Sequence, residues 1–254
     1  MPESPLPASR RPERAFLDAN VIRGQLTNDV LLSVAYAGAF EPRWSQQVLD
    51  EMRRNRPPNL PEQAIDSRIA TMNKAFPRAM TSGYDGLESS MQADPKDRHV
   101  LAAAVHSGSD VLVTDNVKDF NPPTSGVNAM RVERLSEFLS RKLDENPERV
   151  QAGLQAMVDR NWKKEPRSMP ALLDQMADQQ ELRAFAQKLN AVVPADQRGT
   201  SELLTAGQRN SAQHAALDGV ARPGTTQAPA TAPEARKSSG GQGVEKAKDT
   251  DHGK

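Results

Sequence analysis

Two short apolar runs, residues 15–17 (Ala-Phe-Leu) and 111–113 (Val-Leu-Val), place the strongest constraint on the fold of this chain. Each run is apolar at every position, which is typical of a strand buried on both faces in a parallel sheet. We therefore predict strands over residues 14–21 and 111–114, and another near residues 127–132. Stretches with helical spacing of apolar residues separate these strands. This alternation predicts an α/β fold with a mainly parallel sheet flanked by helices.

The stretches between the strands carry the spacing and the end signals of helices. Helices are expected over residues 26–40, 44–54 and 65–76, where apolar residues recur every three to four positions. The next helix is expected to begin at Asp94, because aspartate suits the N-cap and the proline that follows suits the first helical position. A short helix is expected over residues 135–139.

The sequence changes character after the last predicted strand. Two helices are expected over residues 146–162 and 168–189, and no strand pattern follows them. We therefore expect an α/β domain over residues 14–142 and a small helical domain over residues 143–192. Residues 193–254 are dominated by Ala, Gly, Pro, Thr, Gln and Lys, and they are predicted to form a disordered tail. Burial of their few aliphatic groups does not offset the entropy of ordering the chain.

Composition limits the setting of the protein and the kinds of site it can hold. The 254 residues include no cysteine, which excludes disulfides and thiolate zinc sites. Lys plus Arg and Asp plus Glu both number 33, so net charge favours neither a nucleic-acid nor a membrane partner. The first residues lack the apolar run of a signal peptide, and no stretch approaches the ~18–20 apolar residues of a membrane span. We expect a cytoplasmic protein with no membrane partner.

Acidic residues stand where the predicted parallel strands end. Asp18 follows the first strand, and Asp115 and Asp119 follow the strand that ends at Thr114. Ligands of α/β sheets bind beyond the carboxyl ends of the strands, so these side chains are candidates for one common site. Each also has a structural explanation, because Asp18 suits a turn and the other two suit solvent or a local salt bridge. Asn20 is either a turn residue or a donor that orients Asp18.

Two further acids lie at the edge of the apolar stripes of predicted helices. Glu51 either reaches the candidate site or is a solvated carboxylate paired with Arg54 or Asn55. Asp97 shares a helical face with the apolar residues that follow it, which turns it towards the core. A carboxylate in such a place needs a positive partner. The structural alternative for Asp97 is a capping position three residues after Asp94.

The pattern of possible ligands indicates which metal such a site would bind. His99 and His106 share a helical face, but His99 lies roughly 200° around the helix from Asp97, so the histidines are expected at the surface. Ligation by oxygen alone favours Mg²⁺ or Mn²⁺ over zinc. Two such ions ~3.5–4 Å apart can activate a water and stabilise the leaving oxygen of a phosphodiester. The acids therefore predict a metal-dependent hydrolase, and a nuclease in particular.

Several blocks of the chain, taken in order, resemble one family. These blocks are FLDANV, AGAFEPRWSQQVLDEMRRN, MNKAFP, SGYDGL, DPKDRHVLAAAV and VTDNVKDF. Over residues 14–142 the chain is similar to the PIN domain of VapC-type ribonuclease toxins, and it resembles a subgroup with a small helical domain after the PIN domain. The resemblance implies endonucleolytic cleavage of RNA that depends on Mg²⁺ or Mn²⁺. It also implies a homodimer that a cognate antitoxin neutralises, as in type II toxin–antitoxin pairs.

The resemblance further implies roles for individual residues. The family's first three metal-binding and catalytic acids fall on Asp18, Glu51 and Asp97, and its fourth acidic position falls on Asn116. This departure leaves open whether one or two ions bind, with Asp115 or Asp119 as a substitute metal ligand. The residues expected to position the substrate are Asn20, Thr114 and Asn116.

Two other readings compete with the ribonuclease. Asn116 motivates a catalytically degenerate PIN module that binds RNA or a protein partner. An aspartyl-phosphate phosphatase or receiver domain would rest on Asp18, but it needs a second carboxylate where Asn20 stands. Several basic residues are available to steer RNA, namely Arg23, Arg43, Arg53, Arg54 and Arg98.

Overall fold

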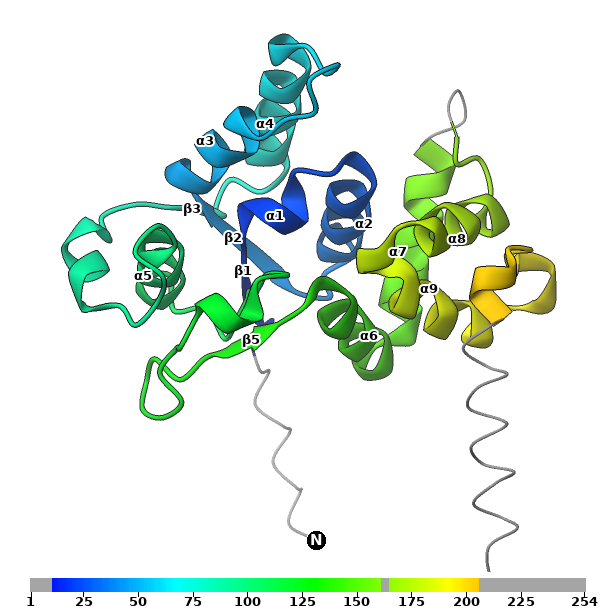
Figure 1. The fold of residues 1–254 in the computed structure, drawn as a ribbon. Coiled ribbons are helices and arrows are strands. Elements are labelled where there is room, and N and C mark those ends of the chain that lie inside the picture. Colours follow the sequence, from blue (N-terminus) through cyan, green and yellow to red (C-terminus); the bar gives the residue numbers. More distant parts are fainter. Residues whose placement is uncertain (1–10, 161–164, 206–254) are drawn as a thin grey trace, which may run out of the picture.

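The computed structural model describes residues 11–160 and 165–205, and its centre is a five-stranded sheet (Figure 1). The strands are β1 (Arg14–Leu17), β2 (Glu41–Ser45), β3 (Met80–Thr81), β4 (Val111–Val113) and β5 (Arg131–Glu133). Their order in the sheet is β3-β2-β1-β4-β5, and every neighbouring pair is parallel. The predicted α/β fold with a mainly parallel sheet is confirmed.

Helices connect the strands and cover the sheet. The helices of this part are α1 (Ala19–Ile22), α2 (Gln25–Tyr36), α3 (Gln46–Arg54), α4 (Glu62–Ala75), α5 (Arg98–His106) and α6 (Leu135–Glu145). In Figure 1, α2 and α6 lie on one side of the sheet and α5 on the other, while α3 and α4 stand together beyond one end of it. Two 3₁₀ turns, η1 (Asp85–Ser90) and η2 (Val117–Asp119), flank α5 and β4.

The core lies between the sheet and these helices. Every residue of β4 and all but the first of β1 are buried, as expected for central strands of a parallel sheet. Phe40 and Phe138 meet edge to face with their ring centroids 4.8 Å apart, which joins the start of β2 to α6. The core therefore fixes the carboxyl ends of β1 and β4 side by side.

The C-terminal helices pack onto the outer side of α2 and α6. They are α7 (Pro147–Arg160), α8 (Met169–Asp178) and α9 (Gln180–Val192), followed by the 3₁₀ turn η3 (Ala195–Gln197). The sequence predicted one helix over residues 168–189, which is wrong. The chain is extended at Gln179 (φ −92°, ψ 120°), and α8 ends there while α9 begins.

The predicted tail begins within the described part of the chain. Residues 193–205 pack against the C-terminal helices: Leu204 is fully buried, and the Thr200 and Ser201 N–H groups donate to Asp174. The remainder of the predicted tail, residues 206–254, lies outside the described residues.

Two element boundaries near the candidate site differ from the sequence prediction. The predicted helix over 44–54 begins two residues later, because Trp44 and Ser45 belong to β2 and the Ser45 hydroxyl caps α3 by accepting from the Val48 N–H. The first strand ends at Leu17 rather than at residue 21, and α1 follows at once. A polar Asp18 therefore sits at the junction of β1 and α1 rather than inside a strand.

Candidate metal centre

Asp18 lies at the carboxyl end of β1, where it is the N-cap of α1. Its carboxylate is buried and accepts three hydrogen bonds: from the Ala19 N–H (2.6 Å), the Asn20 amide (2.8 Å) and the Thr114 hydroxyl (2.7 Å). Thr114 follows β4, the direct neighbour of β1 in the sheet. The parallel pairing of these two strands therefore brings together residues that are 96 positions apart.

A polar network behind Asp18 ties the ends of β1 and β4 to each other. The fully buried Thr114 hydroxyl accepts from the Asn20 amide (2.9 Å) and from the Asn116 N–H (3.1 Å). The Asn20 carbonyl oxygen accepts from the Asp115 N–H (3.2 Å), which turns the amide group towards Asp18. Asn20 and Thr114 thus hold the Asp18 carboxylate in one orientation. The Asn116 side chain is exposed at the edge of this network.

Asp97 lies at the N-cap position of α5, opposite the strand ends. One of its carboxylate oxygens, Oδ2, is buried and has no hydrogen-bond partner within the described residues, and the Lys96 ammonium lies 3.8 Å from it. The prediction that Asp94 caps this helix is wrong. Asp94 lies in an exposed turn before α5, where it accepts from the Lys96 N–H (3.2 Å).

Glu51 points from α3 towards α5, where it meets a histidine. The His99 Nε2 and the Glu51 Oε1 are 2.9 Å apart, and the Arg54 guanidinium lies farther off at 3.8 Å. The prediction of a surface histidine is wrong for His99, whose exposed fraction is 9%, while His106 is exposed. The available signal was the run of apolar residues that follows His99, because it predicts a helix that is buried on most sides over residues 100–105.

Glu51 lies close enough to Asp18 and to Asp97 for its charge to raise the pKa of both. Burial raises the pKa of Asp18 to about 6, the bonds from Thr114 and Ala19 oppose this shift, and the negative charges of Glu51 and Asp97 add to it. Burial also raises the pKa of Asp97, with Lys96 opposing and Asp119 among the acids that add to it. A cation placed among these groups would relieve both burial and repulsion.

The two acids of the loop after β4 face different neighbours. Asp119 lies near enough to Asp97 to raise its pKa. Asp115 instead faces the start of α6: burial raises its pKa, while a bond from the Leu135 N–H and the charge of Arg134 lower it. The structure thus brings Asp119 towards the acid cluster and turns Asp115 away from it.

The donor chemistry of this cluster fits a hard divalent cation. Among the described residues, no three histidine, aspartate or glutamate side chains form a ready-made metal site. The buried oxygen of Asp97 accepts no hydrogen bond within the described residues and has the exposed Lys96 ammonium 3.8 Å away, and burial raises the pKa of Asp18, so the charges of both carboxylates are poorly compensated. Mg²⁺ binds through one or two protein carboxylates and keeps several waters, so it does not require a closed cage. The residues that would hold it are Asp18, Glu51 and Asp97.

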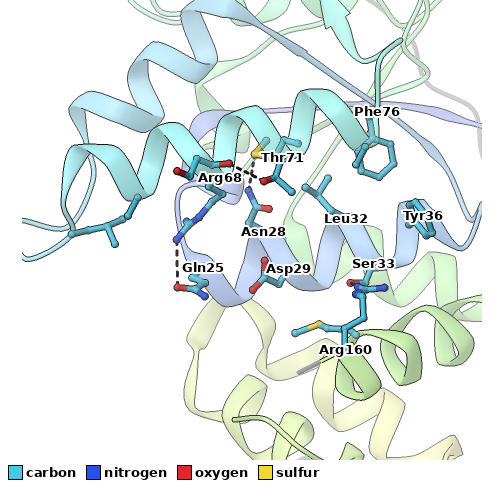
Figure 2. A pocket seen from close by; sticks show the side chains of 16 residues that line it. Gln25, Asn28, Asp29, Leu32, Ser33, Tyr36, Arg68, Thr71, Phe76 and Arg160 are labelled. Carbon is cyan, nitrogen blue, oxygen red and sulfur yellow. Dashed lines mark hydrogen bonds between the residues drawn. The ribbon is translucent and has the colours of Figure 1, made fainter. Parts of the chain in front are cut away.

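A separate cavity of about 810 Å³ lies between α2, α4 and α7 (Figure 2). Tyr36 stands at one end with 71% of its surface exposed and meets Phe76 edge to face. Burial raises the pKa of Asp29 within the cavity, and the charges of Arg68 and Arg160 oppose that shift. The sequence did not predict this cavity, since its lining comes from three separate helices. None of the clustered acids lines it.

No helix in residues 11–160 and 165–205 is long and apolar enough to cross a membrane.

Comparison with known proteins places both parts of the chain in one family. The PIN domain family matches residues 14–118, and the family described as the VapC50 C-terminal domain matches residues 136–191. The chain is 33% identical over 132 residues to a protein of Mycobacterium tuberculosis (strain ATCC 25618 / H37Rv) named "Putative ribonuclease VapC50", a match that covers 50% of this chain and 75% of that protein. No solved structure matches the chain significantly. The chain belongs to the VapC-type PIN-domain family, in the group that carries a VapC50 C-terminal domain.

Proposed function

We propose that this protein is an endoribonuclease that depends on Mg²⁺ or Mn²⁺ and acts as the toxin of a type II toxin–antitoxin pair. The proximity of three carboxylates supports the proposal: Asp18, Glu51 and Asp97 come from three separate segments, the charges of the last two raise the pKa of the buried Asp18, and one oxygen of the partly buried Asp97 accepts no hydrogen bond within the described residues. Membership of the VapC-type family and likeness to a protein named as a ribonuclease support it.

In such a reaction, different residues of the chain bind the metal ion, position a ligand and contact the RNA. A bound divalent ion supplies charge stabilisation at the scissile phosphate and lowers the pKa of water. Asp18, Glu51 and Asp97 hold the ion, and Asp119 lies near enough to Asp97 to add negative charge. Asn20 and Thr114 fix the carboxylate of Asp18 through their hydrogen bonds. Asn116 offers an exposed amide to the RNA at the position where the family has an acid.

The substitution Asp97→Asn tests this proposal. It removes the charge of a proposed ligand while keeping the size of the side chain, so metal-dependent cleavage of RNA is expected to fall at least about 100-fold, as when transition-state stabilisation of some 3 kcal/mol is lost. Asp94→Asn, three residues away in the exposed turn, is the matched control and should retain activity. Cleavage that survives excess EDTA, or that Asp97→Asn leaves unchanged, would rule the proposal out.

A catalytically degenerate PIN module remains the second candidate. Two observations favour it: asparagine occupies position 116, and the described residues contain no preformed group of three metal ligands. Calorimetric titration with Mn²⁺ separates the candidates. The nuclease is expected to bind Mn²⁺ at a site that Asp97→Asn weakens, whereas a degenerate module shows no such binding.

We also propose that the protein is neutralised by a cognate antitoxin, since VapC-type toxins are generally paired with one, and that it acts on RNA as a homodimer, as the resemblance to such toxins implies. Light scattering on the purified full chain measures the dimer. Expression in a bacterial host is expected to arrest growth, and Asp97→Asn should abolish the arrest. A monomer in solution would contradict the proposed homodimer. Normal growth of a host that makes soluble wild-type protein would contradict the proposed toxin activity.

A further inference from the structure

We infer that His99 is the positioning residue of Glu51: its imidazole donates a hydrogen bond to one carboxylate oxygen and leaves the other free for the metal ion. This inference rests on the proposed function, because Glu51 is a ligand only if the site binds metal. It adds a residue that neither the sequence nor the family resemblance assigned to the site.

Glu51 needs such a partner because its side chain is long and only loosely held by other groups. Fixing a glutamate side chain costs about 1.5–2 kcal/mol in rotamer entropy. The Arg54 guanidinium lies 3.8 Å away and is exposed, so this ion pair fixes little. Within the described residues, the His99 Nε2 at 2.9 Å is the hydrogen-bond partner of the Glu51 carboxylate. His99 is therefore the group that sets where the carboxylate lies.

The surroundings of His99 determine which atom carries the proton. The other ring nitrogen, Nδ1, is buried and has no partner within the described residues. The tautomer with its proton on Nδ1 would bury an unpaired N–H there, which costs more than burying a bare lone pair. The tautomer with its proton on Nε2 is thus favoured. In this form His99 donates and the Glu51 Oε1 accepts.

His99 lies in the first turn of α5, beside a proposed metal ligand. The N-cap of the same helix is Asp97, whose backbone carbonyl accepts from the Val100 N–H (3.0 Å). One rigid helix turn therefore carries a proposed ligand, Asp97, and the donor that orients a second ligand, Glu51. Partners of this kind typically change metal affinity or activity 10–100-fold when they are removed. The bond from His99 links α3 to α5 across the metal centre.

The test compares His99→Leu with His99→Gln in the full chain. Leucine fills the buried space without a donor, whereas the glutamine amide can donate to Glu51 from nearly the same place. With Mn²⁺ alone as the probe in calorimetry, His99→Leu is expected to bind at least 10-fold more weakly than wild type, and His99→Gln within about threefold. In RNA cleavage, kcat is expected to fall in His99→Leu while KM changes little. His106→Gln, at the exposed C-terminal end of the same helix, is the control and should match wild type.

The outcomes separate this inference from the proposed function. If wild type binds Mn²⁺ and cleaves RNA, and His99→Leu binds Mn²⁺ equally well, the inference is wrong and the function stands. If His99→Leu and His99→Gln bind Mn²⁺ equally weakly, His99 acts through packing and the inference is also wrong. If wild type itself neither binds Mn²⁺ nor cleaves RNA, both proposals fall. Should His99→Leu not fold, imidazole ¹⁵N shifts of metal-free wild type decide, because a proton on Nδ1 alone overturns the inference.

Discussion

Asp18 illustrates at the scale of one residue how a proposed catalytic group opposes folding. Burial is the main cause that raises its pKa from 3.8 to about 6. The folded protein therefore binds this proton more tightly than the unfolded chain does. The stability that the protonated carboxyl contributes is fully present below about pH 4 and is lost as the pH rises through about 6. Near neutral pH the metal-free protein holds a carboxylate that burial destabilises.

We expect the free energy of unfolding of metal-free Asp18→Asn, measured relative to that of wild type, to be larger at pH 7 than at pH 4. A pKa shift of this size corresponds to at most about 3 kcal/mol between the two pH values. Urea unfolding in EDTA at both pH values measures it. The test is how this difference between variant and wild type changes from pH 4 to pH 7, because the new amide alters the hydrogen bonds to Asn20 and Thr114 at both pH values. Equal differences at pH 4 and pH 7 would contradict it.

Two exposed cations beside the proposed ligands are expected to bind RNA phosphates. Arg54 lies 3.8 Å from Glu51, and Lys96 lies 3.8 Å from Asp97, so neither is held tightly. Arg54→Gln and Lys96→Gln should each weaken binding of a single-stranded RNA and reduce the slope of log K against log salt by about 0.7. Fluorescence anisotropy in EDTA measures this slope. Arg53→Gln is the control, because Arg53 already pairs with two aspartates on α3 and α4.

At the scale of elements, one glycine sets how closely α7 approaches α2. A Cβ added to Gly153 would lie 2.6 Å from the Ser33 carbonyl oxygen and 3.1 Å from the Ala37 Cβ. Alanine favours a helix over glycine by about 1 kcal/mol, yet backbone atoms cannot yield as a flexible side chain does. Gly153→Ala is therefore expected to lower the free energy of unfolding by about 1–3 kcal/mol, a typical cost of overpacking.

Chemical denaturation of the full chain measures this change. Gly86→Ala is the matched control, because an added Cβ there meets no atom within 4 Å, and the stability should hardly change. A Gly153→Ala protein as stable as wild type would mean that α7 can shift along α2 without cost. The close contact would then not define how the C-terminal helices sit on the PIN domain.

The central strands and most helices could be predicted from the sequence because their signals are local. Runs that are apolar at every position identified β1 and β4, and helical spacing identified α2, α4 and α5. The last two residues of β2 were assigned to a helix and the first three to no element, since the buried Trp44 continues the apolar stripe of α3. The two residues of β3 are too few to produce a pattern.

The candidate site followed from the sequence only in part. Parallel strands end at one edge of a sheet, so Asp18 and Thr114 could be expected to meet. The partner of Glu51 could not, because the bond to His99 joins two helices whose relative placement depends on packing. The same holds for Asp115 and Asp119, four residues apart in one loop, which the turn of η2 directs to different neighbours. These assignments of function remain predictions.

At the scale of the whole molecule, an ionic cluster joins the first strand to the helix that leads into the C-terminal domain. Glu13, just before β1, pairs with Lys142 (2.5 Å) and Arg141 (3.1 Å) of α6 and with Arg131 of β5. The Lys142 side chain is only 3% exposed, so its charge depends on these partners. Since the C-terminal family match begins within α6, the cluster connects both parts of the chain.

Substitutions of Glu13 and of Lys142 are expected to lower the free energy of unfolding by different amounts. Glu13→Gln leaves the ammonium of Lys142 buried with the half-exposed Glu145 as its remaining partner, so a loss of about 3 kcal/mol is expected. Lys142→Met replaces the buried charge by an apolar group of similar shape and leaves Glu13 two arginines, so a loss below about 1 kcal/mol is expected. Urea unfolding at low and high salt measures both, and salt should change the values little because buried charges are weakly screened. If both substitutions lowered the free energy of unfolding equally, the cluster would behave as a surface network, and the burial of Lys142 would not affect stability.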